Sequence, residues 1–152
     1  MNNTKFKVVV LSEELDEYLS EKELSHSKIA DAYFEISRCT YGLLAQYPTD
    51  WRELRKGYPE LLEMMDIIQK KNPPQPGEMR DFERNRIAIK NNKDQASKDI
   101  NLGISLMLEQ RRSEIEEKQF KAKLKLDIFA IAFSGVSLGI SILALWGITL
   151  SG

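Results

Sequence analysis

The feature that most constrains this chain is a stretch of 23 uncharged residues, 128–150. All 22 basic and all 23 acidic side chains precede it. A helix of this length spans about 34 Å, against a hydrocarbon core of about 30 Å. Twelve of its residues are Ile, Leu, Val or Phe, which together favour insertion by roughly 4 to 7 kcal/mol. The sequence therefore predicts one transmembrane helix at the C-terminal end.

The alternative is a buried core helix of a soluble protein. Such helices are usually shorter than this stretch or carry one polar face. A secretory signal peptide is N-terminal, and the lysine-rich run before the stretch is a poor match for the polar spacer of a GPI signal. The expected layout is that of a single-pass, tail-anchored membrane protein.

The charges beside this helix predict its orientation. Four lysines precede it, and no charged side chain follows it. The positive-inside rule then places residues 1–127 in the cytoplasm. The same side chains are predicted to contact anionic headgroups, at about 1 kcal/mol each. These lysines are Lys118, Lys121, Lys123 and Lys125.

Small residues inside the helix fall on two opposed faces. Gly135 and Gly139 form a GxxxG pair with Ala132 beside them, and this face is the predicted helix–helix interface. Opposite it, a stripe in the spacing of a heptad seam is a candidate membrane path in an oligomer. The alternative is that small residues are simply common in membrane helices, with Ser bonding its own helix. The stripe comprises Asp127, Ala130, Ser134, Ser137, Ser141 and Ala144.

The whole chain is predicted to be mainly α, in four parts. Residues 1–72 form a small cytosolic helical domain, 73–79 a Pro-rich linker, 80–127 a charged helical stalk and 128–150 the transmembrane helix. One continuous helix is expected over 105–150, with a half-formed coiled-coil heptad. Two stretches leave a minor β element open. Residues 5–11 are β-branched and apolar, and 100–108 alternate like a strand, although a helix is favoured there.

Capping residues predict the helices of the small domain. Ser12 begins a first helix, and Ser27 begins a second over 28–47 that Pro48 ends. Asp50 caps a short helical turn that Gly57 closes. Pro59 then suits the first position of a separate third helix.

Histidine and cysteine occur once each in this chain, and the plentiful carboxylates lie among lysines and arginines on predicted helices. His26, the single histidine, is expected in a solvated loop, and Cys39, the single cysteine, as a small buried hydrophobe in a reducing compartment. CxxC, HExxH, GxGxxG and P-loop motifs are absent from the sequence. We therefore expect no enzyme activity, no cofactor and no metal. A net charge of −1 argues against a nucleic-acid partner.

Two further groups of side chains have competing interpretations. A basic run is either a site for a phosphate-bearing ligand or, as favoured, a solvated helical face. Six aromatic residues are expected to form the core of the small domain, with a ligand groove as the alternative. The basic run is Arg80, Arg84, Arg86, Lys90 and Lys93, and the aromatic residues are Tyr33, Phe34, Tyr41, Tyr47, Trp51 and Tyr58.

The predicted function is that of a membrane-anchored cytosolic interaction or adaptor protein that self-associates through its membrane helix. Its expected partners are the lipid bilayer, further copies of itself and a cytosolic protein whose identity the sequence does not name. The alternative is a membrane-perturbing or pore-forming effector that oligomerises on a signal sensed by the cytosolic domain.

Overall fold

The structure is a computed structural model that describes residues 5–72 and 79–150. Its helices are α1 (Glu13–Ser20), α2 (His26–Gln46), α3 (Trp51–Lys70) and α4 (Met79–Leu150). The described residues contain no strand, so the mainly α prediction is confirmed and the β alternatives for 5–11 and 100–108 are wrong. The chain divides into two compact units, Met1–Arg111 and Arg112–Gly152. We call the described part of the first unit the head.

Serine residues begin the first two helices. The Ser12 hydroxyl accepts the N–H of Leu15 at 3.2 Å, which confirms Ser12 as the N-cap of α1. The predicted cap of the second helix is wrong by two residues. Ser25, with extended backbone, accepts the N–H of Lys28, so His26 is the first residue of α2 rather than part of a loop. Either serine suits a cap by type, and the backbone at Ser25 decides between them.

The third helix is one element where the sequence predicted two. Asp50 caps it as expected, with Oδ1 accepting the N–H of Arg52 at 3.0 Å. Gly57 does not end a turn, because the helix continues to Lys70 with Pro59 inside it. The glycine serves close packing instead: a Cβ at Gly57 would lie 2.6 Å from Cδ2 of Leu43 in α2.

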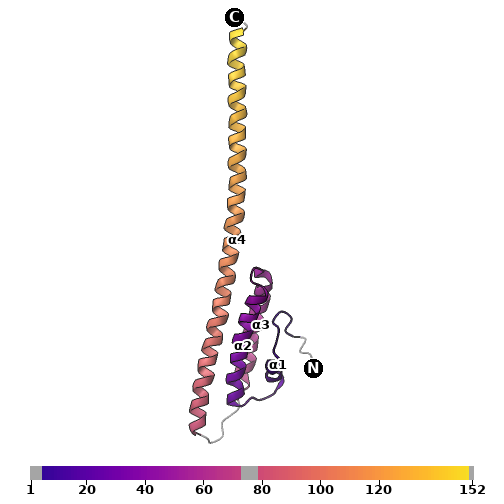
Figure 1. The fold of residues 1–152 in the computed structure, drawn as a ribbon, viewed down its shortest axis with the longest axis vertical. Helices are drawn as coiled ribbons and strands as arrows, with labels where there is room; N and C mark the ends of the chain where they lie inside the picture. The colour runs from indigo at the N-terminus through magenta and orange to yellow at the C-terminus, as the bar shows by residue number, and fades with distance from the viewer. Residues whose placement is uncertain (1–4, 73–78, 151–152) are drawn as a thin grey trace. The chain divides into compact units, whose positions relative to one another are not determined.

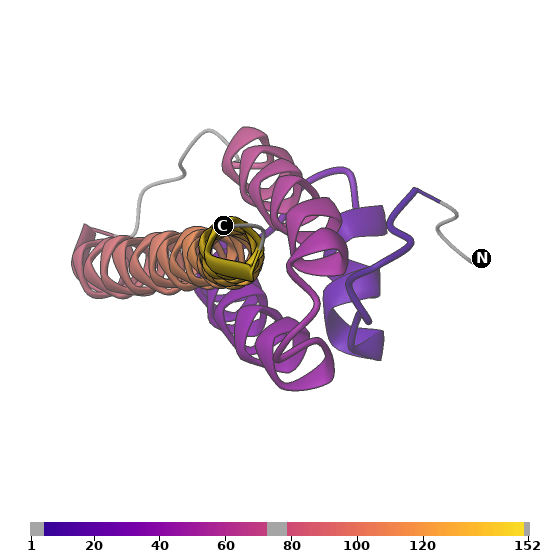
Figure 2. The ribbon, with the colours of Figure 1, turned by 90° about the horizontal axis from the view of Figure 1, so that it is seen from above.

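Helices α2 and α3 and the first part of α4 form a bundle in the head (Figure 1). Asn92 in α4 donates to the carbonyl of Ala30 in α2 at 2.8 Å, and Asp99 accepts from Ser37 further along both helices, so α2 and α4 run parallel. Lys93 donates to Gln69 near the end of α3 at 2.8 Å, and α3 runs antiparallel to both. Viewed from above, α1 lies on the side of α2 and α3 away from α4 (Figure 2).

The first part of α4 belongs to the core of the head. Ala96 and Ile100 are buried, and Ile89, Ile104 and Met107 pack against the same core. The compact unit therefore reaches Arg111, well past the Pro-rich stretch where the sequence analysis placed its boundary. That stretch, 73–78, lies outside the described residues.

The segment before α1 is irregular, and one side chain of α3 accepts three of its backbone N–H groups. The Glu60 carboxylate accepts the backbone N–H groups of Lys7, Val8 and Val9 at 2.9 to 3.0 Å. Phe6 and Val9 are buried against the helices. A carboxylate takes the place of the neighbouring strand that the sequence pattern suggested, because it satisfies the same backbone donors.

Lys71, just after α3, joins two distant connections of the head. Its ammonium group donates to the carbonyls of Tyr18 and Leu19 at 2.9 and 2.7 Å, and also to that of Glu21. Its own carbonyl accepts the N–H of Leu24 at 3.2 Å. The end of α1 is thereby tied to the end of α3.

Candidate functional site

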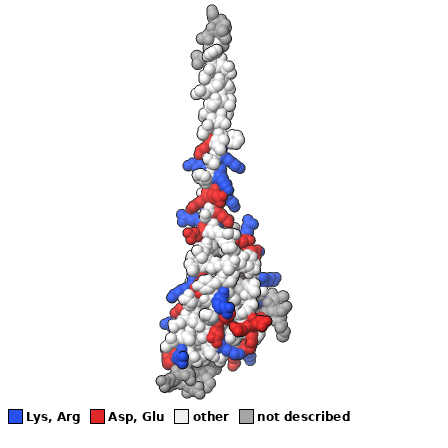
Figure 3. Space-filling view, viewed as in Figure 1, with Lys and Arg blue, Asp and Glu red and all other residues white. Residues whose placement is uncertain are grey.

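The apolar segment of α4 is the first candidate site. Among the described residues, one helix is long and apolar enough to cross a membrane by length and composition. Its large side chains are exposed: Phe129 and Phe133 are each 76% accessible and Leu143 is 73% accessible. Figure 3 shows this segment without a charged side chain, next to a band of mixed charge. An exposed apolar surface of this size marks a site of contact with a membrane or with another protein.

The predicted interface at Gly135 and Gly139 is open in a single chain. No described atom lies within 4 Å of a Cβ built on either glycine, apart from the local helix backbone. Ala132 beside them is exposed. The glycine face therefore has room for a second helix at close approach.

The serine stripe is exposed along its length, but two of its hydroxyl groups donate hydrogen bonds to backbone carbonyls of the same helix. Ser134 donates to the carbonyl of Ala130 at 2.7 Å, and Ser141 donates to that of Ser137 at 2.9 Å. Asp127 and Ala144 are exposed at the two ends of the stripe. A hydroxyl bonded in this way keeps oxygen lone pairs free but has no proton to donate outward.

The predicted headgroup lysines are exposed on α4 before the apolar segment. Lys121 pairs with Glu117 at 2.6 Å, and this hydrogen bond lowers the pKa of the Glu117 carboxyl. Phe120 and Leu126, which lie between and beside these lysines, are about two-thirds exposed. The segment thus mixes cationic and apolar side chains, as suits a membrane–water boundary.

A second candidate site lies between α2 and α4 and was missed by the sequence analysis. Asp99 is 4% exposed, and its carboxyl group accepts from Tyr41 at 2.7 Å, from Gln95 at 2.9 Å and from Ser37. We call these four residues the carboxyl cluster. The hydrogen bond to Asp99 raises the pKa of Tyr41. None of the ion pairs found among the described residues includes Asp99.

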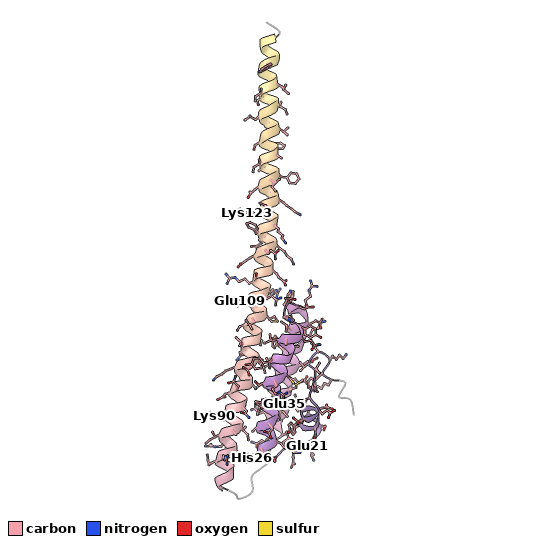
Figure 4. All side chains as sticks on the ribbon, in the orientation of Figure 1. Glu21, His26, Glu35, Lys90, Glu109 and Lys123 are labelled. Carbon is pink, nitrogen blue, oxygen red and sulfur yellow. The ribbon has the colours of Figure 1, made fainter. Side chains whose placement is uncertain are left out.

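The only sequence signal for this cluster is that Asp99 stands directly before Ile100. A carboxylate at such a position is within reach of the buried face, but the sequence does not show which donors meet it. A second buried acid, Glu35 of α2, accepts from Ser12 at 3.1 Å and pairs with Arg38 at 2.8 Å (Figure 4).

Tyr58 of α3 has a buried hydroxyl with no hydrogen-bond partner among the described residues. The residue is 2% exposed, and burial raises its pKa to about 12. Its ring lies against Gly103 of α4, where a Cβ would stand 2.6 Å from the ring carbon Cζ. Burial of this unpaired hydroxyl destabilises the contact between α3 and α4.

The aromatic residues are only partly in the core. Tyr33 and Tyr58 are buried as predicted, whereas Phe34 and Tyr41 are more than half exposed. An open groove of about 530 Å³ does exist near the end of α2, but leucines rather than the predicted aromatic residues line much of it. It is lined by Leu44, Pro48, Thr49, Leu54, Leu106, Glu109 and Gln110.

The remaining candidate residues have structural surroundings. Cys39 is buried, its thiol donates to the Val10 carbonyl at 3.6 Å, and burial raises its pKa to about 11, which confirms the buried hydrophobe. In the basic run, Arg86 pairs with Glu83 and Lys93 donates to Gln69. Among the described residues, no group of three or more His, Cys, Asp or Glu is arranged to hold a metal ion.

Comparison with protein-family models, with curated proteins and with solved structures finds no match for this chain.

Proposed function

We propose that this chain is a membrane-anchored interaction protein, with a helical head on the cytoplasmic side that binds a protein partner. The observation that supports the proposal most directly is the run of exposed apolar side chains on α4 from Ile128 to Trp146. In water this surface would aggregate, and in a bilayer it is solvated. We propose a binding role rather than a catalytic one.

Membrane residence is tested by fractionation of cells that express the chain. The full chain should stay in the membrane pellet after alkaline carbonate extraction, whereas a chain truncated after Leu126 should be released. A full chain that carbonate releases would exclude a spanning anchor.

Orientation is tested with cysteines placed on either side of the anchor. In a Cys39→Ala background, Ser151→Cys should react with a membrane-impermeant maleimide on intact cells, and Ser113→Cys should react only after lysis. The physical basis is the lysine bias before the anchor. The reverse labelling pattern would place the head outside the cytoplasm.

Self-association through the glycine face completes the proposal. The combined change Gly135→Ile and Gly139→Ile fills the face with branched side chains, so it should abolish oligomers in detergent crosslinking. The control is Val136→Ile with Leu138→Ile, which alters neighbouring large side chains and should leave the oligomers intact. Unchanged oligomers in the glycine variant would remove this face as the interface.

A membrane-perturbing effector is the second candidate function, and the exposed serine stripe ending at Asp127 is what favours it. Expression of the intact chain should then collapse the membrane potential, and truncation after Leu126 should prevent this. Replacement of Ser134, Ser137 and Ser141 by Ala should reduce the collapse if the stripe lines a path. An unchanged potential under every activating condition would leave the anchoring role alone.

A further inference from the structure

The open groove near the end of α2 is lined by leucines from three helices of the head. Leu54 of α3 is buried, whereas Leu44 of α2 is half-buried and Leu106 of α4 is 44% exposed. We call it the leucine groove. Apolar surface that water still reaches gains free energy when another apolar group covers it. The leucine groove is therefore a place where an outside side chain can bind.

The register between α2 and α4 places this groove at the third layer of their contact. Asn92 donates to the Ala30 carbonyl, and Asp99 accepts from Ser37, so seven residues on each helix separate the first two layers. One more step of seven on both helices reaches the two leucines that line the groove together. This is the spacing of a coiled-coil seam. The seam is closed by hydrogen bonds at two layers and is apolar and partly open at the third.

Exposed apolar side chains continue the surface of the groove along both helices. Tyr41 is 51% exposed, lies one turn before Leu44 and donates to a carboxylate of α4 at 2.7 Å. Phe34 is 55% exposed two turns before it, and on α4 Leu102 is 51% exposed one turn before Leu106. An amphipathic helix lying along α2 and α4 would cover this whole surface, because its apolar side chains recur every three to four residues.

The charge at the groove indicates what kind of helix fits. Among the described residues that line it, Glu109 alone is charged, and it is exposed. None of the ion pairs within residues 5–72 and 79–150 includes Glu109. Residues 39–49 on the α2 side carry no charge, and the nearby Arg52 and Arg111 lie over the ring of Trp51 at 5.8 and 5.0 Å. A carboxylate beside an apolar groove favours a cation beside the apolar face of the partner.

We infer that the leucine groove is where the head binds its protein partner, and that the partner contributes an amphipathic helix with Lys or Arg beside its apolar face. The inference rests on the proposed function and deepens it by naming the site and the chemistry of the partner. A large apolar side chain of that helix enters between Leu44 and Leu106, and the cation pairs with Glu109. The apolar contact supplies most of the affinity, since an exposed ion pair contributes little. The carboxylate discriminates against acidic helices.

Binding is measured with the full chain in phosphatidylcholine nanodiscs and two fluorescent helical peptides. Both peptides carry leucines along one face, and beside that face one has lysines where the other has glutamates. Fluorescence anisotropy should show the lysine peptide binding about three- to tenfold more tightly, because Glu109 attracts one peptide and repels the other. Empty nanodiscs measure the binding that lipid alone provides. Binding no stronger than to empty nanodiscs, or equal binding of the two peptides, would overturn the inference.

Reversal of one charge tests whether Glu109 causes the preference. Glu109→Lys should make the glutamate peptide the tighter ligand. Asp94→Lys, at an exposed position of α4 that does not line the groove, is the matched control and should keep the preference for the lysine peptide. A preference that Glu109→Lys leaves unchanged would contradict the role of this carboxylate.

Removal of one leucine tests the groove itself. Leu106→Ser should weaken the binding of both peptides about tenfold, because the groove loses apolar surface at its open edge. Leu108→Ser is the matched control, since Leu108 is 55% exposed on the same helix and does not line the groove. Equal affinities in these two variants would overturn the groove as the binding site.

A second variant blocks the groove without removing a leucine. Thr49→Trp, at an exposed residue of the lining, places a ring over the groove and should weaken binding as Leu106→Ser does. Circular dichroism of each variant confirms that the head stays folded. Carbonate extraction of the same variants keeps the two proposals apart. A chain that stays in the membrane but shows no dependence on the groove would defeat this inference and leave the anchor intact.

Discussion

Gly103 of α4 lies so close to Tyr58 of α3 that a Cβ on the glycine would stand 2.6 Å from the Cζ atom of the ring. A glycine inside a helix costs about 1 kcal/mol relative to alanine, so its place here needs a packing reason. The reason is that two helices approach until a ring fills the space of a side chain. Tyr58 and Gly103 together set the distance between α3 and α4.

Gly103→Ala should therefore destabilise the head by about 1 to 3 kcal/mol, because the added methyl group meets the ring and forces the helices apart. Urea unfolding of the full chain in detergent, followed by circular dichroism, measures the change. Gly42→Ala is the matched control, since nothing lies within 4 Å of a Cβ there and the helix interior should gain up to about 1 kcal/mol. If Gly103→Ala instead stabilised the head, the Tyr58 ring would be able to move aside at little cost, which would contradict the prediction.

Glu60→Gln should loosen the segment before α1. The carboxylate accepts three backbone N–H groups, and the amide that replaces it has lost the charge and one acceptor oxygen. We expect a loss of about 1 to 3 kcal/mol in local stability, seen as faster hydrogen exchange at the amides of Val8 and Val9. Glu63→Gln removes only the exposed pair with Lys5 and should change exchange little. Equal effects of both variants would mean that general charge, not the three hydrogen bonds, holds the segment.

Alkaline pH should destabilise the head through Cys39. Burial raises the pKa of its thiol from 9.0 to about 11, so the folded chain keeps a proton that the unfolded chain releases first. The stability from this group is fully present below pH 9 and is lost as pH rises through about 11. Cys39→Val should flatten the decline between pH 9 and 11 by up to roughly 2 to 3 kcal/mol. Tyr33 and Tyr58, whose pKa values burial raises to about 12, titrate in both chains, so the difference isolates the thiol.

The measurement for this prediction is urea unfolding at pH 8, 9, 10 and 11, with Cys39→Val compared with the unaltered chain at each pH. An identical pH slope in the two chains would contradict a buried, protonated thiol. A steeper slope in Cys39→Val would mean that the folded chain holds the thiolate instead.

On the proposed orientation, replacing the four lysines that precede the apolar segment by glutamine should weaken the preference for one orientation in the membrane. The change at Lys118, Lys121, Lys123 and Lys125 removes the whole charge bias next to the apolar segment while preserving helix propensity. A mixed population of both orientations is expected, measured by maleimide access to Ser113→Cys in intact cells. Glutamine at Lys90 and Lys98 with two further exposed basic positions, Arg84 and Arg86, is the control of equal charge change farther from the anchor. A unique orientation in the juxtamembrane variant would show that another feature sets it.

Several parts of this fold can be predicted from the sequence because they depend on residues that are close together in the chain. Ser12 and Asp50 are recognisable caps, since the acceptor side chain and the helix it begins are neighbours in the chain. The apolar segment of α4 is equally predictable, because its length and lack of charge suffice to identify it. The helix over 105–150 follows from continuity with that segment.

Other parts depend on residues far apart in the chain. Gly57 and Pro59 read as a helix boundary, yet Leu43 from another helix occupies the space over the glycine and α3 continues. Around Ala96 and Ile100 the sequence fits two patterns, the spacing of a buried helical face and the alternation of a strand. Only the presence of α2 and α3 decides between the two patterns. Asp99 is the extreme case, because its donors Ser37 and Tyr41 come from a helix about sixty residues earlier.

Three carbonyl groups accept hydrogen bonds from the ammonium group of Lys71, so its chemical reactivity differs between the folded and the unfolded head. Trypsin and acylating reagents both need that ammonium group free, since the protease must draw it into its own pocket and the reagent must attack its nitrogen. Cleavage and acylation at Lys71 should therefore lag behind those at the exposed Lys70 for as long as α1 stays in place. A peptide map taken over minutes then reports whether this small helix is attached, without any label added to the chain.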